Sequence, residues 1–184
     1  NIHMEGVIVD GTLGDGGHTE SILKNTGPKT RVLGIDRDLY AIERARKRLQ
    51  PFRDRVIFAH GSLENLQDIV AKSGVTKING LLLDFGVSSP QLDTPERGFS
   101  IRHDGPLDMR MDNSQKTTAA NLLEKLKDVE LISIIKNFGE ERFAKKIVRA
   151  IRKEQSGRPV VTTSRLAEII SRAVKAPRYS RIHP

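Results

Sequence analysis

The sequence contains no cysteine and no tryptophan, and aromatic residues make up only 4% of its 184 residues. Without cysteine there can be no disulfide framework and no thiolate metal site. The scarcity of aromatic residues argues against a broad stacking platform for single-stranded nucleic acid. No apolar run is long enough to cross a bilayer and no signal peptide is visible, so we expect a cytoplasmic protein without membrane contact. A hydrophobic content of 37% is ordinary for a globular protein.

Positive charge is concentrated in the last part of the chain. Residues 1–113 contain 15 Lys/Arg and 16 Asp/Glu, whereas residues 114–184 contain 16 Lys/Arg and 7 Asp/Glu. A segregated basic region suits a polyanionic partner, because each neutralised phosphate releases condensed counterions. The alternative is a solvated helical surface that happens to be rich in Lys and Arg.

Short apolar segments alternate with amphipathic segments in the first half of the chain. The strand-like segments are 6–10, 31–36, 56–59 and 78–85, and the helix-like segments between them are 19–25, 39–49 and 63–72. This rhythm predicts an α/β fold, a doubly wound Rossmann-like parallel sheet with right-handed crossovers. Four strands would leave the edge beside the fourth strand uncovered, so we expect the sheet to be completed by residues outside this sequence.

The pattern changes at Gly86. Residues 86–116 are rich in Ser, Pro, Asp, Gly and Arg and predict a long loop, and loops of this length are usually functional or disordered. Helical periodicity follows in segments 118–127, 129–137, 140–154 and 163–176. Since both the period and the charge change, we expect a nucleotide-binding domain over 1–105 and a basic helical domain for substrate recognition over 106–184.

A glycine-rich turn follows the first strand, with the sequence Asp10-Gly11-Thr12-Leu13-Gly14-Asp15-Gly16-Gly17-His18-Thr19. Glycines allow a tight turn and a close approach of a ligand to the backbone. The turn lacks the lysine of a phosphate loop, and its G-x-G-G spacing is not the dinucleotide pattern. A plain turn between strand and helix is the alternative.

Two acidic residues end later strands and belong to the same predicted site. Asp36 ends the second strand, where a carboxylate accepts hydrogen bonds from ribose hydroxyls and repels a ribose phosphate. S-adenosylmethionine fits, since it has an adenosine, no phosphate and a sulfonium that tolerates acidic neighbours such as Asp10 and Asp15. Asp84 stands at the end of the fourth strand and should face the same crevice. NAD remains an alternative ligand, and capping of the next helix is the alternative role for Asp36.

Several longer motifs make the sequence recognisable. They are Gly16-Gly17-His18, the segments 83–93, 95–100, 104–112 and 139–144, and the final His183-Pro184. The chain resembles the small-subunit ribosomal RNA cytosine-N4 methyltransferase family (RsmH, formerly MraW) over its full length. The resemblance implies a methyltransferase sheet domain with a helical domain inserted after the fourth strand. It also implies that family segments before the first strand and after His183-Pro184 are missing here, which leaves open whether this chain alone is active.

The resemblance further implies the cofactor and its contacts. S-adenosylmethionine would be bound by Gly16, Gly17, His18, Asp36, Asp84 and Gln91. The family usually has phenylalanine where Leu63 stands, and Leu63 would cover the adenine by apolar packing without an aromatic stack.

The reaction implied by the family is methylation of the exocyclic N4 amine of a cytidine in small-subunit ribosomal RNA. That amine is a poor nucleophile, so an enzyme helps by aligning it and accepting a proton. Asp84 is the first candidate for this role; Asp108 and Arg110 come next, as a proton acceptor and as a holder of RNA. The alternatives are that Asp84 serves the cofactor, and that Asp108 and Arg110 simply pair. The sequence shows no metal-ligand cluster, so no metal is expected.

A basic helical stretch is the expected RNA-binding surface. Its cations are Lys145, Lys146, Arg149, Arg152 and Lys153, and the spacing of 145, 149 and 152 puts three on one face. The expected partner is small-subunit ribosomal RNA or the 30S-type subunit; the oligomeric state is left open, a homodimer included. Two alternatives remain, a non-catalytic RNA-binding assembly factor and a methyltransferase acting on a small molecule or protein.

Overall fold

The computed structural model describes residues 5–174, which form two compact units. The sheet unit contains the chain up to Gly86 together with Met111–Ser114, and the helical unit contains Val87–Arg110 and the chain from Gln115 onward. The division therefore differs from the expected boundary between 105 and 106. The reason is local: residues 87–105 pack with the helices, whereas Asp112 returns to the sheet unit, with its Oδ1 atom 3.9 Å from Nε2 of His60.

The sheet unit is built on four parallel strands in the order β3-β2-β1-β4. Their bounds are Gly6–Asp10 for β1, Thr30–Asp36 for β2, Val56–His60 for β3 and Gly80–Leu82 for β4. Helices α1 (Gly17–Asn25), α2 (Leu39–Arg48) and α3 (Leu66–Lys72) connect them. The predicted α/β doubly wound, Rossmann-like arrangement is confirmed.

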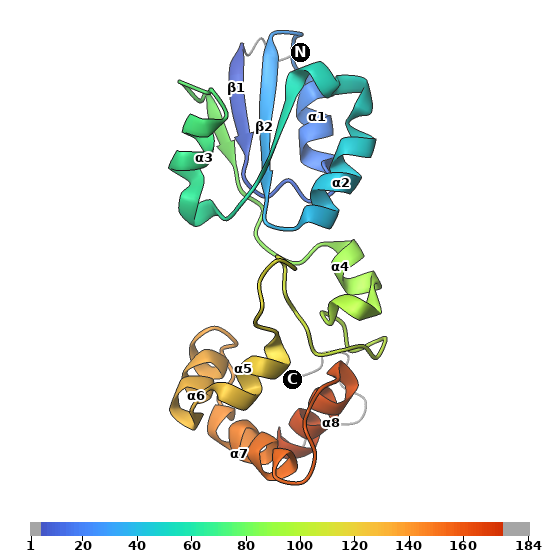
Figure 1. Ribbon diagram of the computed structural model, residues 1–184, viewed down its shortest axis with the longest axis vertical. Coiled ribbons are helices and arrows are strands. Elements are labelled where there is room, and N and C mark those ends of the chain that lie inside the picture. Colours follow the sequence, from blue (N-terminus) through green and yellow to red (C-terminus); the bar gives the residue numbers. More distant parts are fainter. Residues whose placement is uncertain (1–4, 175–184) are drawn as a thin grey trace. The chain divides into compact units, whose positions relative to one another are not determined.

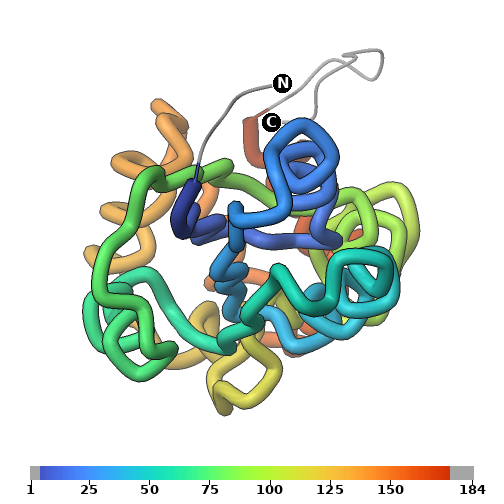
Figure 2. Tube along the Cα trace, turned by 90° about the horizontal axis from the view of Figure 1, so that it is seen from above, coloured from blue at the N-terminus to red at the C-terminus, as the bar shows by residue number. Residues whose placement is uncertain are grey.

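Apolar residues cover both faces of the sheet because successive strand residues point to opposite sides. Ile8 and Val32 pack on one face with Leu23 of α1 and Ile42 of α2, and Val9 and its neighbours pack on the other face with α3. Figure 1 shows α1 and α2 on one side of the sheet and α3 on the other, and the view from above in Figure 2 shows the same separation. The carboxyl ends of all four strands thus meet at one edge.

The fourth strand is shorter than the segment 78–85 that was predicted. Its three residues pair with Ile8–Asp10 of β1, and β1 ends at Asp10. Because β1 ends at Asp10, the residues after Leu82 have no strand residue of β1 to pair with, and they leave the sheet. Within the described residues β4 pairs with β1 alone and lies at the edge of the sheet.

The helical unit contains five α-helices within the described residues. They are α4 (Ser89–Asp93), α5 (Ala119–Lys125), α6 (Asp128–Asn137), α7 (Ala144–Gln155) and α8 (Thr163–Val174). The segment 86–116 is therefore not loop throughout, since α4 and a 3₁₀ turn at Pro95–Arg97 lie within it. The helix predicted over 140–154 begins only at Ala144, because Glu140 has a positive φ of 53° that no helix accommodates. His183-Pro184 lies outside the described residues.

The core of the helical unit is formed by the buried faces of α7 and α8. Ile147 and Ile151 of α7 pack with Ile169 and Ala173 of α8, and Leu107 joins this cluster. Apolar residues on α7 recur three and four positions apart, which places them on one face and its cations on the other. The basic side of α7 is thereby turned to solvent.

Candidate functional site

The glycine-rich turn joins β1 to α1 and depends on glycine at two positions. Gly14 and Gly16 have φ angles of 51° and 80°, in the left-handed region that glycine adopts without strain. A Cβ atom on Gly16 would lie 2.9 Å from Cδ1 of Leu49, so a side chain has no room there. Gly17 and His18 are exposed at the start of α1. The turn therefore brings backbone N–H groups and an exposed imidazole to the carboxyl edge of the sheet.

Asp36 connects the end of β2 to this turn. Its Oδ2 atom accepts a hydrogen bond from the Gly14 N–H at 2.7 Å, and its Oδ1 atom accepts one from the Asp38 N–H at 2.9 Å. Each carboxylate oxygen has a second lone pair, so the half-buried carboxylate retains acceptor capacity for a diol. Capping of α2 is done by Asp38, which accepts from the Tyr40 N–H. The alternative role for Asp36 as the cap of α2 is therefore wrong.

Asp84 follows β4 and comes close to the turn. Its N–H donates to Oγ1 of Thr12 at 2.7 Å, and its Oδ2 atom lies 3.9 Å from Nδ1 of His18. Both the Asp84 carboxylate and the His18 imidazole are largely exposed, at 67% and 58% of their side-chain surface. Thr12 was not singled out from the sequence, although a hydroxyl inside a glycine-rich turn is a usable signal.

Two acidic residues of the turn region have other partners. Asp10 is fully buried and accepts a hydrogen bond from the Thr19 hydroxyl at 2.7 Å, and burial raises the pKa of its carboxyl. Asp15 is paired with Arg44 of α2, with Oδ1 2.7 Å from Nε. Asp10 therefore has a structural contact inside the unit, and the charge of Asp15 is balanced by its neighbour.

Apolar side chains lie near the same edge. Leu63, in the 3₁₀ turn Leu63–Asn65 after β3, reaches over the end of β1, since a Cβ on Gly11 would lie 2.7 Å from its Cδ2 atom. Leu39 and Tyr40 open α2 just beyond Asp36 and remain 49% and 52% exposed. Sequence reasoning missed this pair: the spacing of Leu39 from Ile42 and Ala45 predicts a place on the buried face of the helix, whereas the structure leaves it exposed. They add apolar surface next to the carboxylate that faces the turn.

The structure brings together Gly16, Gly17, His18, Asp36, Leu63 and Asp84, all of which belong to the sheet unit. Gln91 belongs to the helical unit, where its buried side chain accepts a hydrogen bond from the Ser88 N–H at 2.9 Å in the capping box of α4. The Gln91 side-chain amide therefore helps to cap α4 within its own unit.

Asp108 and Arg110 form a bidentate ion pair in the helical unit. Nε of Arg110 donates to Oδ1 of Asp108 and the terminal NH2 donates to Oδ2, both at 2.7 Å. The hydrogen bonds from Arg110 lower the pKa of Asp108, which makes its carboxylate a weaker proton acceptor. The other terminal nitrogen of Arg110 donates to the Gln115 carbonyl at 2.6 Å, which holds the following loop.

The cations expected to bind RNA divide into two groups. Lys145, Lys146, Arg149 and Lys153 are exposed on α7, and within residues 5–174 none has a carboxylate within 4 Å. Arg152 differs, because its Nε lies 2.7 Å from Oδ1 of Asp128 and its terminal nitrogens donate to the carbonyls of Leu123 and Leu126. Arg152 therefore stabilises the end of α5 and is not part of the free basic face.

Among the described residues, no three His, Asp or Glu side chains are grouped so that they could hold a metal ion. In the same part of the chain, no helix is long and apolar enough to span a membrane.

Comparison with known proteins identifies relatives for the whole chain. The model of the MraW methylase family matches residues 1–184. The chain is 47% identical over 184 residues to the "Ribosomal RNA small subunit methyltransferase H" of Carboxydothermus hydrogenoformans, covering 100% of this chain and 58% of that protein. It is 51% identical over 168 residues to the protein of the same name from Micrococcus luteus, covering 91% of this chain and 50% of that protein. The chain thus spans between 50% and 58% of the length of these two relatives.

A solved structure also resembles the chain at a low level. The crystal structure of an rRNA methylase from Streptococcus thermophilus aligns with a TM-score of 0.38 and 18% identity, covering 68% of this chain and 73% of that one. This likeness is too small to bear on the fold, which rests on the strand order and register of the chain itself.

Proposed function

Because the chain belongs to the MraW methylase family, we propose that it supplies the S-adenosylmethionine site and the RNA-binding surface of a methyltransferase. The proposed reaction is transfer of a methyl group to the N4 amine of a cytidine in small-subunit ribosomal RNA, in the cytoplasm. The observation that carries this proposal is the meeting of the glycine-rich turn, Asp36 and Asp84 at one edge of a parallel sheet.

The residues at this edge fit S-adenosylmethionine. Asp36 has lone pairs left for the ribose hydroxyls, and Gly17 is exposed at the start of α1, next to the turn that Gly16 shapes. Leu63 offers apolar surface to the adenine. The exposed carboxylate of Asp84 suits a neighbouring positive charge, and the cofactor supplies an activated methyl group. Gln91 remains a proposed contact on the strength of the family resemblance.

Asp84 is the proposed group that holds the cytosine amine. Its carboxylate is exposed, and its backbone is anchored by the Thr12 hydroxyl, so the side chain is held at the cofactor edge. It would accept a hydrogen bond from the amine and thereby orient the nitrogen lone pair toward the methyl group. Asp108 and Arg110 are the second candidates; their ion pair suits a role in holding the RNA better than one in removing a proton.

The RNA would be bound through its phosphates by the exposed face of α7. Lys145, Lys146, Arg149 and Lys153 have no competing carboxylates within 4 Å in the described part of the chain. Such cations release counterions on binding a polyanion, which favours association at low salt. The proposed substrate is small-subunit ribosomal RNA, free or in the 30S-type subunit.

The test is methylation of purified small ribosomal subunits by the longer protein that contains this region, with the product nucleoside identified by mass. We expect N4-methylcytidine from the wild type and a large loss of turnover from Asp84→Ala. Asp54→Ala, at an exposed position away from the site, is the control and should retain activity. Binding of RNA without any methyl transfer would instead identify a non-catalytic assembly factor.

A further inference from the structure

Phe138 is the most exposed large apolar side chain among residues 5–174, with 84% of its surface accessible. It stands at the carboxyl end of α6, where its N–H donates to the Ile134 carbonyl at 3.0 Å. An isolated ring at this exposure gains nothing from the core of the helical unit. Such an exposed ring is a candidate contact for a binding partner.

The turn after Phe138 is held in a defined shape. A Cβ on Gly139 would lie 2.7 Å from the Ile135 carbonyl oxygen, so only glycine fits there. Glu140 has a φ of 53°, which a residue with a side chain adopts at a cost. The Glu141 N–H then donates to the Ile135 carbonyl at 3.2 Å. The ring is thus presented by a fixed turn.

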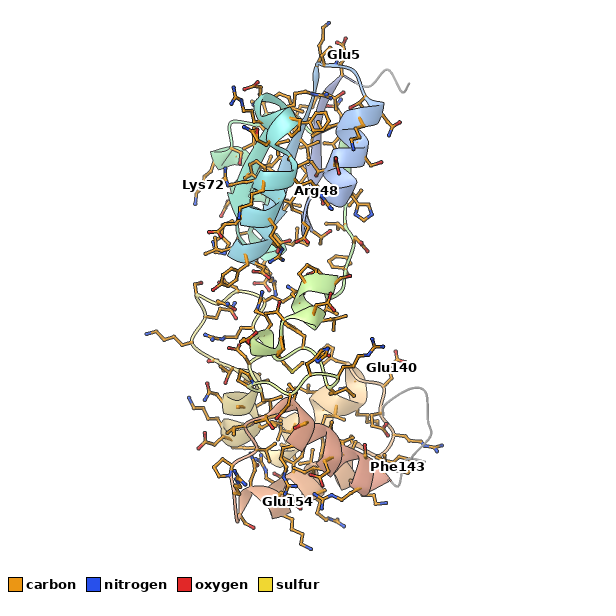
Figure 3. The ribbon with its side chains drawn as sticks, turned by 90° about the vertical axis from the view of Figure 1, so that its right-hand side faces the viewer. Glu5, Arg48, Lys72, Glu140, Phe143 and Glu154 are labelled. Carbon is orange, nitrogen blue, oxygen red and sulfur yellow. The ribbon has the colours of Figure 1, made fainter. Side chains whose placement is uncertain are left out.

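Cations and a second ring lie on the other side of this turn. The Arg142 guanidinium carbon is 4.7 Å from the centre of the Phe143 ring, and Nζ of Lys146 is 5.9 Å from it. Figure 3 shows Phe143 and Glu140 at the margin of the helical unit. We call Phe138, Arg142, Phe143 and Lys146 the aromatic corner; they follow one another along the chain from the end of α6 to the first turn of α7.

The charges around the aromatic corner favour an anionic partner. Residues 136–153 contain seven Lys/Arg and two Glu. One of the two acids, Glu141, is half-buried and accepts a hydrogen bond from the Phe143 N–H at 2.6 Å. The other, Glu140, is exposed. By contrast, Arg165 and Arg172 of α8 are neutralised by Glu154 and Glu168.

We propose that the aromatic corner is a stacking subsite for an unpaired base of RNA, with Phe138 as the stacking residue. This inference rests on the proposed function in taking RNA as the partner. A base offers a flat apolar face to Phe138, and the adjoining phosphates are reached by Arg142 and Lys146. An apolar protein surface would match the ring but would offer no anionic group to these cations. Two rings suffice for a narrow subsite, whereas the chain has too few aromatics for a broad platform.

The experiment measures binding of the longer protein to three fluorescent probes: a 12-nucleotide single-stranded RNA, a duplex RNA of the same length, and an abasic ribose-phosphate oligomer. Phe138→Ala should weaken binding of the single strand by about 5- to 150-fold, the equivalent of ~1–3 kcal/mol per stacked base. It should leave the abasic oligomer and the duplex unchanged. Phe138→Trp should restore binding.

Val129→Ala is the matched control, since Val129 is 70% exposed on the same helix. It should change no affinity, and neither variant should alter thermal unfolding because both side chains are exposed. Equal affinity of wild type and Phe138→Ala for the single strand would overturn the subsite, as would an equal loss with the abasic oligomer. A wild type that binds none of the probes but methylates purified small ribosomal subunits would overturn the subsite alone. A wild type that also fails to methylate small subunits would reject the proposed function itself, which separates the two failures.

Discussion

The Asp36 carboxylate shapes the glycine-rich turn by accepting from the Gly14 N–H, and it is also the group that we propose to bind the ribose hydroxyls. We expect Asp36→Ala to weaken binding of S-adenosylmethionine by about 10- to 150-fold, because a hydrogen bond to a charged group contributes about 1.5–3 kcal/mol. Asp36→Asn should lose less, since an amide oxygen still accepts from one N–H. Isothermal titration calorimetry on the longer protein measures the effect, with Asp38→Asn as a control that keeps the cap of α2. An unchanged dissociation constant for Asp36→Ala would rule out the ribose contact.

Asp10 gives the sheet unit a pH-dependent component of stability. Burial raises the pKa of this carboxyl above its ordinary value of 3.8, so the folded state favours the protonated form. The stabilisation that results from this raised pKa is fully present when the pH is below the pKa of Asp10 in the unfolded chain. It is lost as the pH rises through the higher pKa of Asp10 in the folded protein. The free energy of unfolding of Asp10→Asn should therefore improve relative to wild type as pH increases from about 4 toward neutrality.

Urea unfolding across this pH range measures the free energy of unfolding of wild type and of Asp10→Asn. The contributions of the other carboxyl groups cancel in the difference between the two proteins. Thr19→Val, which removes the hydrogen bond to Asp10, should destabilise the wild type at neutral pH more than it destabilises the Asp10→Asn variant. A difference between Asp10→Asn and wild type that is constant with pH would show that Asp10 does not titrate in this way.

At the scale of elements, Arg152 links three helices of the helical unit. From α7 it reaches Asp128 of α6 and the last carbonyls of α5, groups that a helix end otherwise leaves without partners. We expect Arg152→Met to destabilise the unit by about 1–3 kcal/mol, because hydrogen bonds from a charged donor are lost from a mostly buried side chain. Thermal unfolding followed by circular dichroism measures this loss.

Arg149 provides the matched comparison on the same helix, since it is exposed and has no carboxylate within 4 Å in the described residues. Arg149→Met should leave the unfolding temperature unchanged and weaken RNA binding. If Arg152→Met weakened RNA binding without lowering the unfolding temperature, Arg152 would belong to the RNA-binding face after all.

At the scale of the whole molecule, the uneven charge predicts a strong salt dependence of RNA binding. The logarithm of the affinity should fall linearly with the logarithm of salt concentration, with a slope of about 0.7 per neutralised phosphate of a single strand. Replacing Lys145, Lys146 and Lys153 together by Gln should reduce the slope by about 2. Fluorescence titrations between low and moderate salt measure it, whereas binding of S-adenosylmethionine should change far less.

Arg165 and Arg172 are the control for this prediction because Glu154 and Glu168 already neutralise them. Replacing both by Gln should leave the slope of RNA binding unchanged. A slope that depends equally on both sets of cations would mean that net charge alone, rather than the face of α7, governs binding.

Much of this molecule follows from local sequence. The alternation of apolar strands and amphipathic helices predicted the parallel sheet, and the positions of Asp36 and Asp84 at strand ends predicted that both reach one edge. Hydrophobic periodicity is a local property, so it identifies elements and their buried faces without knowledge of their partners. Turns between helices were less predictable. Glu140 has a positive φ, so α7 begins only after it, and hydrophobic periodicity does not reveal such a backbone angle.

Only the tertiary structure decided which partners the polar residues take. The N–H of Asp84 meets Thr12 across 72 residues, and Arg152 reaches Leu126 across 26, while nearby Arg149 has no such partner among residues 5–174. Lys and Arg residues look alike in a sequence, and the choice between an ion pair and a free charge depends on which helices come together. For the same reason the sequence by itself determined a basic helical region, and the packing of α5, α6 and α7 determined which of its cations have no carboxylate within 4 Å in the described part of the chain.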